Sequence, residues 1–356
     1  MAKRKVRLAI VGCGTISRAG GPGYVGHPNC EVVALCDPVR ERAEERAKEW
    51  GIAPKIYTGY DDVLNDPNVE AVELLTPTHM HPSQSIAALE AGKHVSCQKP
   101  VSKDVAGADQ IARAVKSAKT VFRVTENFLY YPPIVKAKEL LDKGVIGEPS
   151  LIRLRTTTGR NKKYERIKLE EGALTWRRDP KLNPGGLIFD SGWHRFATAV
   201  WWGGGIERIS AMITRTPDYL VESPSACIWK YTGRDCLGIL EDVLTPQMEI
   251  RGKYYPVDDF FEIVGSKGII WVTRCTGELL DLPPVMVIKG SETTNIQVPS
   301  DWMEGFNGAA AGFVDAILKD EQPMMDIAFS KQVLQVTLAA YQASDSGKQV
   351  APSAVK

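Results

Sequence analysis

A chain of 356 residues is long enough for two domains with a sizeable core, since one domain commonly holds about 150 residues. Hydrophobic residues make up 44% and charged residues 24%, with a formal net charge of +1, which favours a soluble globular protein and gives no support for nucleic-acid binding. The first residues contain no apolar run long enough for a signal peptide or a membrane span, so we expect a cytoplasmic protein without a membrane partner. The seven cysteines lack C-x-x-C spacing and are expected to be reduced and mostly buried.

The first predicted element is a buried strand that runs into a glycine turn. Residues 6–11 are apolar and rich in β-branched side chains, and GCGTIS follows them. Gly12 permits a tight turn, and Gly14 lets the backbone approach a pyrophosphate at the start of the next helix. A serine stands where the third glycine of G-x-G-x-x-G would be, so the match is incomplete. The spacing predicts a dinucleotide-binding turn that includes Gly12, Gly14, Thr15 and Ile16.

A second apolar strand, residues 31–36, ends in Asp37. A carboxylate at this position can hold two ribose hydroxyls and repels the 2′-phosphate of NADP, so NAD is the expected cofactor. Arg40 and Arg42 lie nearby and leave NADP open as an alternative. Asp37 is also placed to cap the helix expected to begin at Pro38.

The chain then alternates between helices and strands. Further strands are predicted at 56–57, 71–75, 95–97 and 121–124, with helical patterns between most of them. Such alternation implies right-handed βαβ units. We therefore expect an α/β protein whose N-terminal part is a Rossmann domain with a doubly wound parallel sheet.

The loop after the fourth strand contains Thr76, Pro77, His79 and His81. It leaves the sheet at the same edge as the glycine turn and should flank the nicotinamide, so Thr76, Pro77 and His81 are predicted cofactor contacts. The two histidines are two residues apart, but no carboxylate or cysteine accompanies them. No metal site is expected.

A lysine stands where the fifth strand ends. Lys99 follows the apolar run, and Pro100 bars the strand from continuing. Ligands of open parallel sheets bind beyond the carboxyl ends of the strands, so Lys99 is placed to meet a bound cofactor. A solvated lysine on a turn is the alternative.

From residue 151 the pattern changes to strands with a period of two. They are predicted at 151–156, 209–214, 226–231 and 269–272. This period suits an antiparallel sheet with one face on the core, so we expect a C-terminal α+β domain with an open, mostly antiparallel sheet. The expected domains are 1–126 and 127–356. A basic stretch, residues 160–168, is expected to be a solvated face or a lid, with an acidic substrate as the alternative.

Asp190 and His194 form a second chemical centre. On a helical turn, residues four apart share a face, so a carboxylate and an imidazole would point at one spot. The alternatives are a structural histidine and a helix cap at Asp190.

The chain resembles the Gfo/Idh/MocA family, the dehydrogenases related to glucose-fructose oxidoreductase and inositol 2-dehydrogenase. The resemblance covers nearly the whole chain and rests on AIVGCGTIS, LCDP, TPTHMHPSQSIAALEAGKHVSCQKPVSKD, ENFLYYPPIVKAKELLDKGVIGEP, WRRDPKLNPGGLIFDSGWH, EIVGSKGIIWV and GFVDAILKDEQPMMDIAFSKQVLQVTLAAYQAS. It implies cofactor contacts from Gln98 and Asn127, and places Trp176 and Arg177 near the nicotinamide and substrate. Two positions depart from the pattern. Gln98 replaces the usual glutamate of E-K-P, and the arginine often found after the asparagine is missing beside Asn127.

The resemblance implies hydride transfer between NAD and a secondary hydroxyl of a sugar, glycoside or cyclitol. Our favoured reaction is oxidation of a glucoside at C3, with an inositol or aldose C1 dehydrogenase and a non-catalytic NAD-sensing regulator as alternatives. In this scheme His194 is the base, Asp190 orients it, and Lys99 stabilises the developing alkoxide. Lys99 as the base, with His194 binding the hydroxyl, stays open. The resemblance also implies a homo-oligomer, a dimer or tetramer, formed through the open sheet face.

Overall fold

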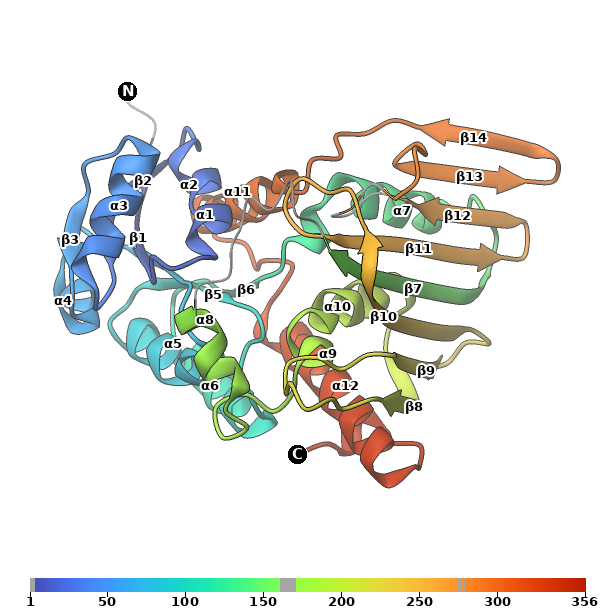
Figure 1. Ribbon diagram of the computed structural model, residues 1–356. Helices are drawn as coiled ribbons and strands as arrows, with labels where there is room; N and C mark the ends of the chain where they lie inside the picture. Colours follow the sequence, from blue (N-terminus) through green and yellow to red (C-terminus); the bar gives the residue numbers. More distant parts are fainter. Residues whose placement is uncertain (1–3, 161–170, 274–276, 278) are drawn as a thin grey trace. The chain divides into compact units, whose positions relative to one another are not determined.

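The computed structural model describes residues 4–160, 171–273, 277 and 279–356 (Figure 1). The chain forms two compact units, and each draws on three separate segments. The first comprises Met1–Glu126, Leu169–Pro184 and Phe306–Leu334, and the second comprises Asn127–Lys168, Gly185–Gly305 and Gln335–Lys356. The division into independent domains at 126/127 stays a prediction. Most of the basic stretch 160–168 lies outside the described residues.

The first unit contains a six-stranded sheet in which every pair of neighbours is parallel. The strand order is β3-β2-β1-β4-β5-β6. The bounds are β1 Val6–Val11, β2 Cys30–Cys36, β3 Lys55–Tyr57, β4 Ala71–Leu74, β5 His94–Gln98 and β6 Phe122–Thr125. Since the order reverses between β1 and β4, this is the doubly wound Rossmann arrangement and confirms the predicted fold.

Helices follow most of these strands. They are α1 Ser17–Gly20, α2 Pro22–Val25, α3 Arg40–Trp50, α4 Tyr60–Asn65, α5 His81–Glu90 and α6 Val105–Ser117. Helix α3 ends at Trp50, and its C-cap residue is Gly51, whose φ of 65° lies in the left-handed region that favours glycine. The predicted cap at Asp37 is wrong, because α3 begins at Arg40 with Val39 as its extended N-cap residue.

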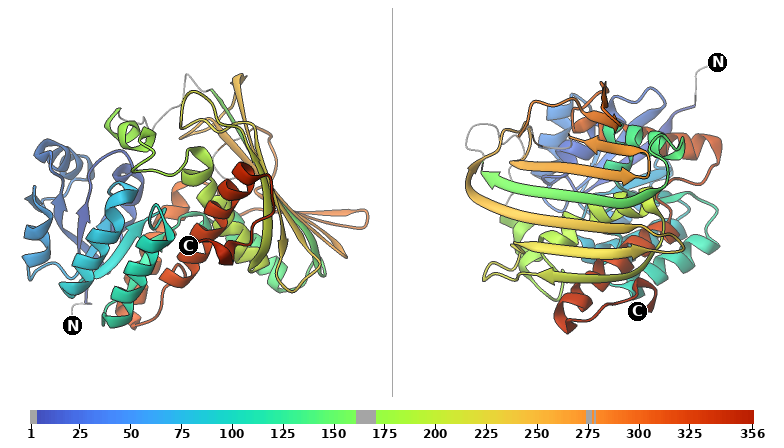
Figure 2. Two further views of the ribbon diagram at one scale, coloured as in Figure 1. Left: turned by 90° about the horizontal axis from the view of Figure 1, so that it is seen from below. Right: turned by 90° about the vertical axis from the view of Figure 1, so that its right-hand side faces the viewer.

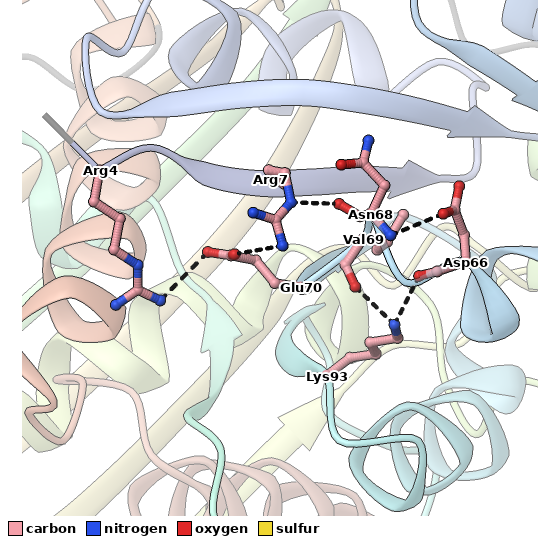
Figure 3. Close-up of polar contacts among 7 residues, drawn as sticks. All are labelled: Arg4, Arg7, Asp66, Asn68, Val69, Glu70 and Lys93. Carbon is pink, nitrogen blue, oxygen red and sulfur yellow. Dashed lines mark hydrogen bonds and ion pairs between the residues drawn. The ribbon is translucent and has the colours of Figure 1, made fainter. Parts of the chain in front are cut away.

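Polar contacts within the protein engage the charged side chains near the amino ends of the strands of this sheet (Figure 3). Glu70, just before β4, pairs with Arg7 at 3.2 Å and with Arg4 at 3.6 Å. Lys93 donates to two backbone carbonyl oxygens of the preceding loop, at 2.7 and 2.9 Å. These charges are therefore engaged with their own chain at the edge opposite the glycine turn.

The second unit is built on an eight-stranded sheet of order β14-β13-β12-β11-β7-β10-β9-β8. Only β7 and β10 pair in parallel, which confirms a mostly antiparallel sheet. The bounds are β7 Pro149–Arg160, β8 Ile206–Ile213, β9 Ser225–Tyr231, β10 Leu237–Glu249, β11 Val257–Gly265, β12 Gly268–Val272, β13 Val285–Lys289 and β14 Glu292–Ile296. All four strands predicted for this half are present.

One face of this sheet is covered by helices, and the other has no described helix over it (Figure 2). The second unit includes α7 Pro132–Asp142, α9 Leu187–Asp190 and α10 Gly192–Gly203. Two longer helices, α11 Met303–Lys319 and α12 Ile327–Ser346, contribute residues to both units. Burial alternates strictly along β9, as expected for a sheet with one face on the core. Among the described helices, none has the length and hydropathy needed to cross a membrane.

The cysteines do not form bridges in the described part of the chain. All six cysteines there are reduced and buried. Burial raises the pKa of the Cys13 thiol to about 12, so this residue of the glycine turn is a neutral apolar side chain. Cys275 lies outside the described residues.

Candidate active site

The glycine turn between β1 and α1 has the geometry that its sequence predicts. Gly12 has a φ of 97°, and a Cβ there would lie 2.6 Å from the backbone oxygen of Leu75, so only glycine fits. A Cβ at Gly14 would meet no atom within 4 Å. The Ser17 hydroxyl donates to the Gly14 carbonyl at 2.6 Å and closes the turn. Thr15 and Ile16 lie between them.

Asp37 is joined directly to this turn. Its carboxylate accepts from the Cys13 N–H and from the Val39 N–H, each at 2.9 Å and each on a different oxygen. The residue is 4% exposed, so its orientation is set by these two bonds. A carboxylate oxygen has about two acceptor directions, and one on each oxygen remains for a ribose hydroxyl. Arg40, one of the two nearby arginines, pairs with Glu44 at 3.6 Å.

His81 connects the loops after β4 and β5. It is fully buried, with Nδ1 2.7 Å from the Pro100 carbonyl oxygen and Nε2 2.9 Å from the Thr76 carbonyl oxygen. Burial lowers the pKa of His81 to about 4, so the imidazole is neutral at pH 7 and donates only one of these bonds. The Thr76 hydroxyl in turn donates to the Gln84 side-chain oxygen at 2.5 Å. Cofactor contacts from Thr76, Pro77 and His81 stay predictions.

Gln98 and Lys99 stand at the carboxyl end of β5. Gln98 is the last residue of the strand and is 7% exposed, whereas Lys99 is half-buried. The Gln98 side-chain oxygen accepts from the Lys99 backbone N–H at 2.8 Å, which fixes the amide against the turn. The predicted placement of the lysine at the edge of the sheet is confirmed.

The segment with Trp176 and Arg177 belongs to the first unit, although it is distant in sequence. Trp176 lies 6.0 Å from the ring of His79, in the loop after β4, and the Arg177 guanidinium lies 4.4 Å from the Trp176 ring centroid. Arg177 also donates to the Ala173 carbonyl at 2.7 Å. Burial lowers the pKa of His79, so its uncharged form is favoured. From its spacing to His81, His79 is evaluated as a metal ligand, but its place in the loop after β4 is the feature that indicates a role in this cluster.

Asp190 and His194 belong to the second unit, on consecutive helical turns. Asp190 is the last residue of α9, and His194 lies in the first turn of α10. The N-cap residue of α10 is Ser191, and no side chain caps this helix, so the capping role for Asp190 is wrong. Both side chains are half-buried. Gly185 and Gly186 precede them where a Cβ would meet Tyr341 at 2.1 Å and the Leu220 oxygen at 2.5 Å.

Asn127 is the first residue of the second unit. It is 2% exposed, and its side-chain nitrogen has no hydrogen-bond partner among the described residues. Gly305 packs against the Asn127 backbone, since a Cβ there would lie 2.5 Å from the Asn127 backbone carbonyl oxygen. An unpaired buried donor is costly, so this amide is suited to a ligand acceptor.

A hollow of about 570 Å³ in the second unit contains none of the predicted site residues. Lys138, Trp201, Arg234 and Lys267 are among its lining residues, at the carboxyl ends of α7 and α10. Lys138 donates to both carboxylate oxygens of Asp142, at 2.5 and 2.6 Å, so this cation is paired within the chain. No group of three metal-ligating side chains is found in the described part of the chain.

The residues of the first unit fit NAD. Open space lies in front of Gly14, and Asp37 retains acceptor capacity for a ribose diol. The first unit thus carries the glycine turn, Asp37, Lys99, Trp176 and Arg177, whereas Asn127, Asp190 and His194 are in the second.

Comparison with known families identifies the class of protein. Residues 6–126 match the Gfo/Idh/MocA model described as an oxidoreductase family with an NAD-binding Rossmann fold, and residues 134–271 match the Gfo/Idh/MocA C-terminal domain. Together these matches cover more than half of the chain. The chain belongs to the Gfo/Idh/MocA oxidoreductase family, and its N-terminal part is that family's NAD-binding fold.

Three curated relatives are named for sugars or cyclitols. A levoglucosan dehydrogenase from Pseudarthrobacter phenanthrenivorans is 25% identical over 63% of this chain and 58% of its own. An inositol 2-dehydrogenase from Salmonella paratyphi B is 33% identical over 34% of this chain and 37% of its own. A dTDP-3,4-didehydro-2,6-dideoxy-alpha-D-glucose 3-reductase from Actinomadura kijaniata is 24% identical over 89% of each chain. The first two matches span less than two thirds of the relative's length.

Solved structures share the fold along the whole chain. An oxidoreductase from Agrobacterium radiobacter, in complex with NAD+, L-tartaric acid and magnesium, has a TM-score of 0.84 at 18% identity, covering 98% of this chain and 99% of that one. Levoglucosan dehydrogenase, in complex with NADH and levoglucosan, has a TM-score of 0.81 at 20% identity with the same coverage.

Proposed function

We propose that the chain is an NAD-dependent dehydrogenase that oxidises a secondary hydroxyl of a sugar, glycoside or cyclitol. The observation that carries the proposal is the Asp37 carboxylate, which two backbone N–H groups hold beside an open glycine turn in a chain of this family. The names of the three relatives support the substrate class. A 3-reductase aligned over 89% of the chain supports our favoured reaction, oxidation of a glucoside at C3.

The side chains have distinct tasks in this reaction. NAD, when bound, supplies the acceptor for the hydrogen that leaves carbon with its electron pair. The proton on oxygen needs a base, and we assign it to His194, whose ordinary pKa near 6.5 suits the task, with Asp190 orienting the imidazole. Lys99 donates to the same oxygen and stabilises negative charge as it develops. The alternative assignment has Lys99 as the base, and the turnover of the variants described below tests it.

Selectivity for NAD follows from Asp37. Two backbone N–H groups fix the orientation of the Asp37 carboxylate. The carboxylate therefore cannot rotate away from the 2′-phosphate of NADP, and it would repel that phosphate. Asp37→Ser removes the charge while leaving a small hydrogen-bonding group. We expect its affinity for NAD to fall and the preference over NADP to shrink by roughly tenfold or more, which corresponds to about 1.4 kcal/mol. Titration with both dinucleotides measures this, and equal binding of both by the unsubstituted protein would contradict the assignment.

We also propose that the open sheet face joins copies of this chain. Met212, Ile228, Leu237 and Val243 are large apolar residues on the uncovered face of β8, β9 and β10, and Met212 is 82% exposed. Contiguous apolar surface of this kind favours association. A homodimer or a tetramer would bury it.

The experiment for the activity is a panel of aldoses, inositols and glycosides mixed with the purified chain and NAD. NADH absorbance reports turnover, and NMR of the product identifies the oxidised carbon. We expect Lys99→Ala, Asp190→Ala and His194→Ala to lower kcat by about two to four orders of magnitude while NAD still binds. Binding of NAD without turnover on any member of the panel would contradict the proposal. Near-normal turnover by His194→Ala would exclude His194 as the base.

A further inference from the structure

The imidazole of His194 lies face to face with the phenyl ring of Phe128. Their centroids are 4.5 Å apart, and the two planes differ by 13°. Phe128 begins the short 3-10 helix η2, Phe128–Tyr130, and is 3% exposed, whereas His194 is half-buried. Both residues are in the second unit. One face of the imidazole is therefore covered by a buried aromatic ring.

The backbone that carries His194 is anchored separately. Arg195, the next residue, donates to the Ser191 hydroxyl at 2.5 Å and to Asp259 Oδ1 of β11 at 2.9 and 3.2 Å. Thr156 of β7 donates to the same Asp259 oxygen at 2.7 Å. Arg195 and Asp259 are 2% and 1% exposed. A buried pair with several hydrogen bonds holds its geometry well, so the first turn of α10 is tied to the sheet.

These two contacts restrain different degrees of freedom. The Arg195–Asp259 pair fixes the helical turn, but it does not act on the terminal torsion of the neighbouring histidine, which is broad in isolation. The stacked ring of Phe128 restrains that torsion, because rotation of the imidazole out of the stack would drive its edge into the phenyl face. Aromatic pairs also favour defined relative orientations beyond the effect of burial. The stack with Phe128 therefore restrains the plane in which the two imidazole nitrogens lie.

We propose that Phe128 is a positioning residue that holds His194 in the plane in which it takes a proton from the substrate hydroxyl. This inference rests on the proposed function, since it gives the stack a role in the same reaction. Proton transfer depends on alignment of donor and acceptor, and a misplacement of about 1 Å can cost roughly a hundredfold in rate.

The kinetic test compares Phe128→Leu with Phe261→Leu. Phe261 is fully buried in β11 of the same unit and meets the Trp202 ring edge-on at 6.0 Å, so its substitution is a matched loss of a core phenyl. We expect Phe128→Leu to lower kcat by roughly ten- to a hundredfold with little change in KM. Phe128→Tyr should restore most of it, and Phe261→Leu should retain kcat. Equal kcat values for the two leucine variants would overturn the proposal.

A second readout needs no turnover. Histidines labelled with carbon-13 at Cε1 are observed by NMR, and His194→Gln identifies the missing signal. The ring current of a stacked phenyl shifts the His194 proton upfield, so we expect this shift in the unsubstituted protein and in Phe128→Tyr, and its loss in Phe128→Leu. Phe261→Leu should keep it. An unshifted His194 signal in the unsubstituted protein overturns the inference even if Phe128→Leu fails to fold. If no sugar is oxidised, the proposed function fails, and the NMR comparison still decides whether Phe128 orders the imidazole.

Discussion

At the scale of single residues, the strongest sequence prediction is the glycine turn. Its geometry could be predicted because glycine marks positions with special backbone requirements. Gly12 has a φ of 97°, and Gly14 faces open space. The contact from the Cys13 N–H to Asp37 could not be read from the sequence, because it joins residues 24 apart through the end of a second strand. The same holds for the stack of Phe128 on His194.

Gly14→Ala separates cofactor binding from folding. The added Cβ meets nothing within 4 Å in the protein itself, so the melting temperature should be unchanged. The methyl group would occupy the space through which the backbone approaches a pyrophosphate, and we expect NAD affinity to fall by about tenfold or more. Gly26→Ala, whose Cβ would have its nearest contact at 3.5 Å, is the control. Isothermal titration with NAD is the measurement, and unaltered binding by Gly14→Ala would show that the pyrophosphate lies elsewhere.

Gln98→Glu tests the position that departs from the family pattern. A carboxylate beside the nicotinamide favours the positively charged NAD ring over neutral NADH, whereas the present amide does not. Two charges about 4 Å apart at an effective dielectric of about 20 interact by around 4 kcal/mol, which is an upper bound here. We expect the ratio of NADH to NAD dissociation constants to rise several-fold. Gln110→Glu, an exposed position on α6, is the control for added charge. If both variants give the ratio of the unsubstituted protein, Gln98 does not tune the cofactor.

At the scale of elements, the period-two pattern found four strands of the second sheet and missed β10, β11, β13 and β14. A physical reason is visible in β10 and β11, which carry Asp242 and Asp259 at inward positions where apolar residues are expected. Both aspartates pair with Thr156 of β7 in the sheet register, so they form one buried polar row. Such a row interrupts the apolar alternation of the sequence. Its partner is apparent only in the folded structure, where Arg195 pairs with Asp259.

Asp242 gives this row a pH dependence. Burial raises its pKa from 3.8 to about 6, with Arg195 opposing the shift and Asp259 and Glu222 adding to it. The folded protein therefore takes up this proton near pH 6, whereas the unfolded chain does so near pH 4. The unfavourable contribution of the charged Asp242 is complete above this window and is lost as the pH falls through it. Because a shift of one pKa unit corresponds to 1.36 kcal/mol, the charged Asp242 carboxylate destabilises the folded protein by roughly 3 kcal/mol at neutral pH.

Asp242→Asn removes the charge at nearly constant volume. We expect the stability of the variant relative to the unsubstituted protein to be greater near pH 8 than near pH 4, by up to roughly 3 kcal/mol. Denaturant titrations at the two pH values measure the difference. The same relative stability at both would mean that the carboxyl titrates normally.

At the scale of the whole molecule, the two sheets were predictable, but the assembly of each unit from three segments was not. Phe313 and Val314 of α11 share a hydrophobic cluster with Leu8 and Ile10 of β1, some 300 residues earlier in the chain. Arg123 of β6 also donates to the Ala309 carbonyl of that helix. Contacts of this sequence separation leave no local pattern. The expected cytoplasmic location stays a prediction.

Ile228→Lys tests association through the uncovered sheet face. Ile228 is 45% exposed, so a lysine there should not disturb the core, but burial of its charge in an interface would be costly. We expect the variant to have a smaller molar mass by light scattering than the unsubstituted protein, with little change in melting temperature. Lys230→Arg, on the same strand and face, is the control. A monomeric unsubstituted protein, or an unchanged assembly of the variant, would contradict the proposal.

The most direct test of the central claim follows the hydrogen atom itself. A glucoside with deuterium on C3 is incubated with the purified chain and NAD, and the reduced cofactor is analysed by mass spectrometry. We predict that the label appears in the cofactor, that the sugar product is the 3-keto compound, and that His194→Ala transfers it at least about a hundredfold more slowly. Reduced cofactor without the label would contradict transfer from C3. The absence of reduced cofactor with this glucoside and with every sugar and cyclitol of the panel, despite measurable NAD binding, would contradict the assignment as a dehydrogenase of this class.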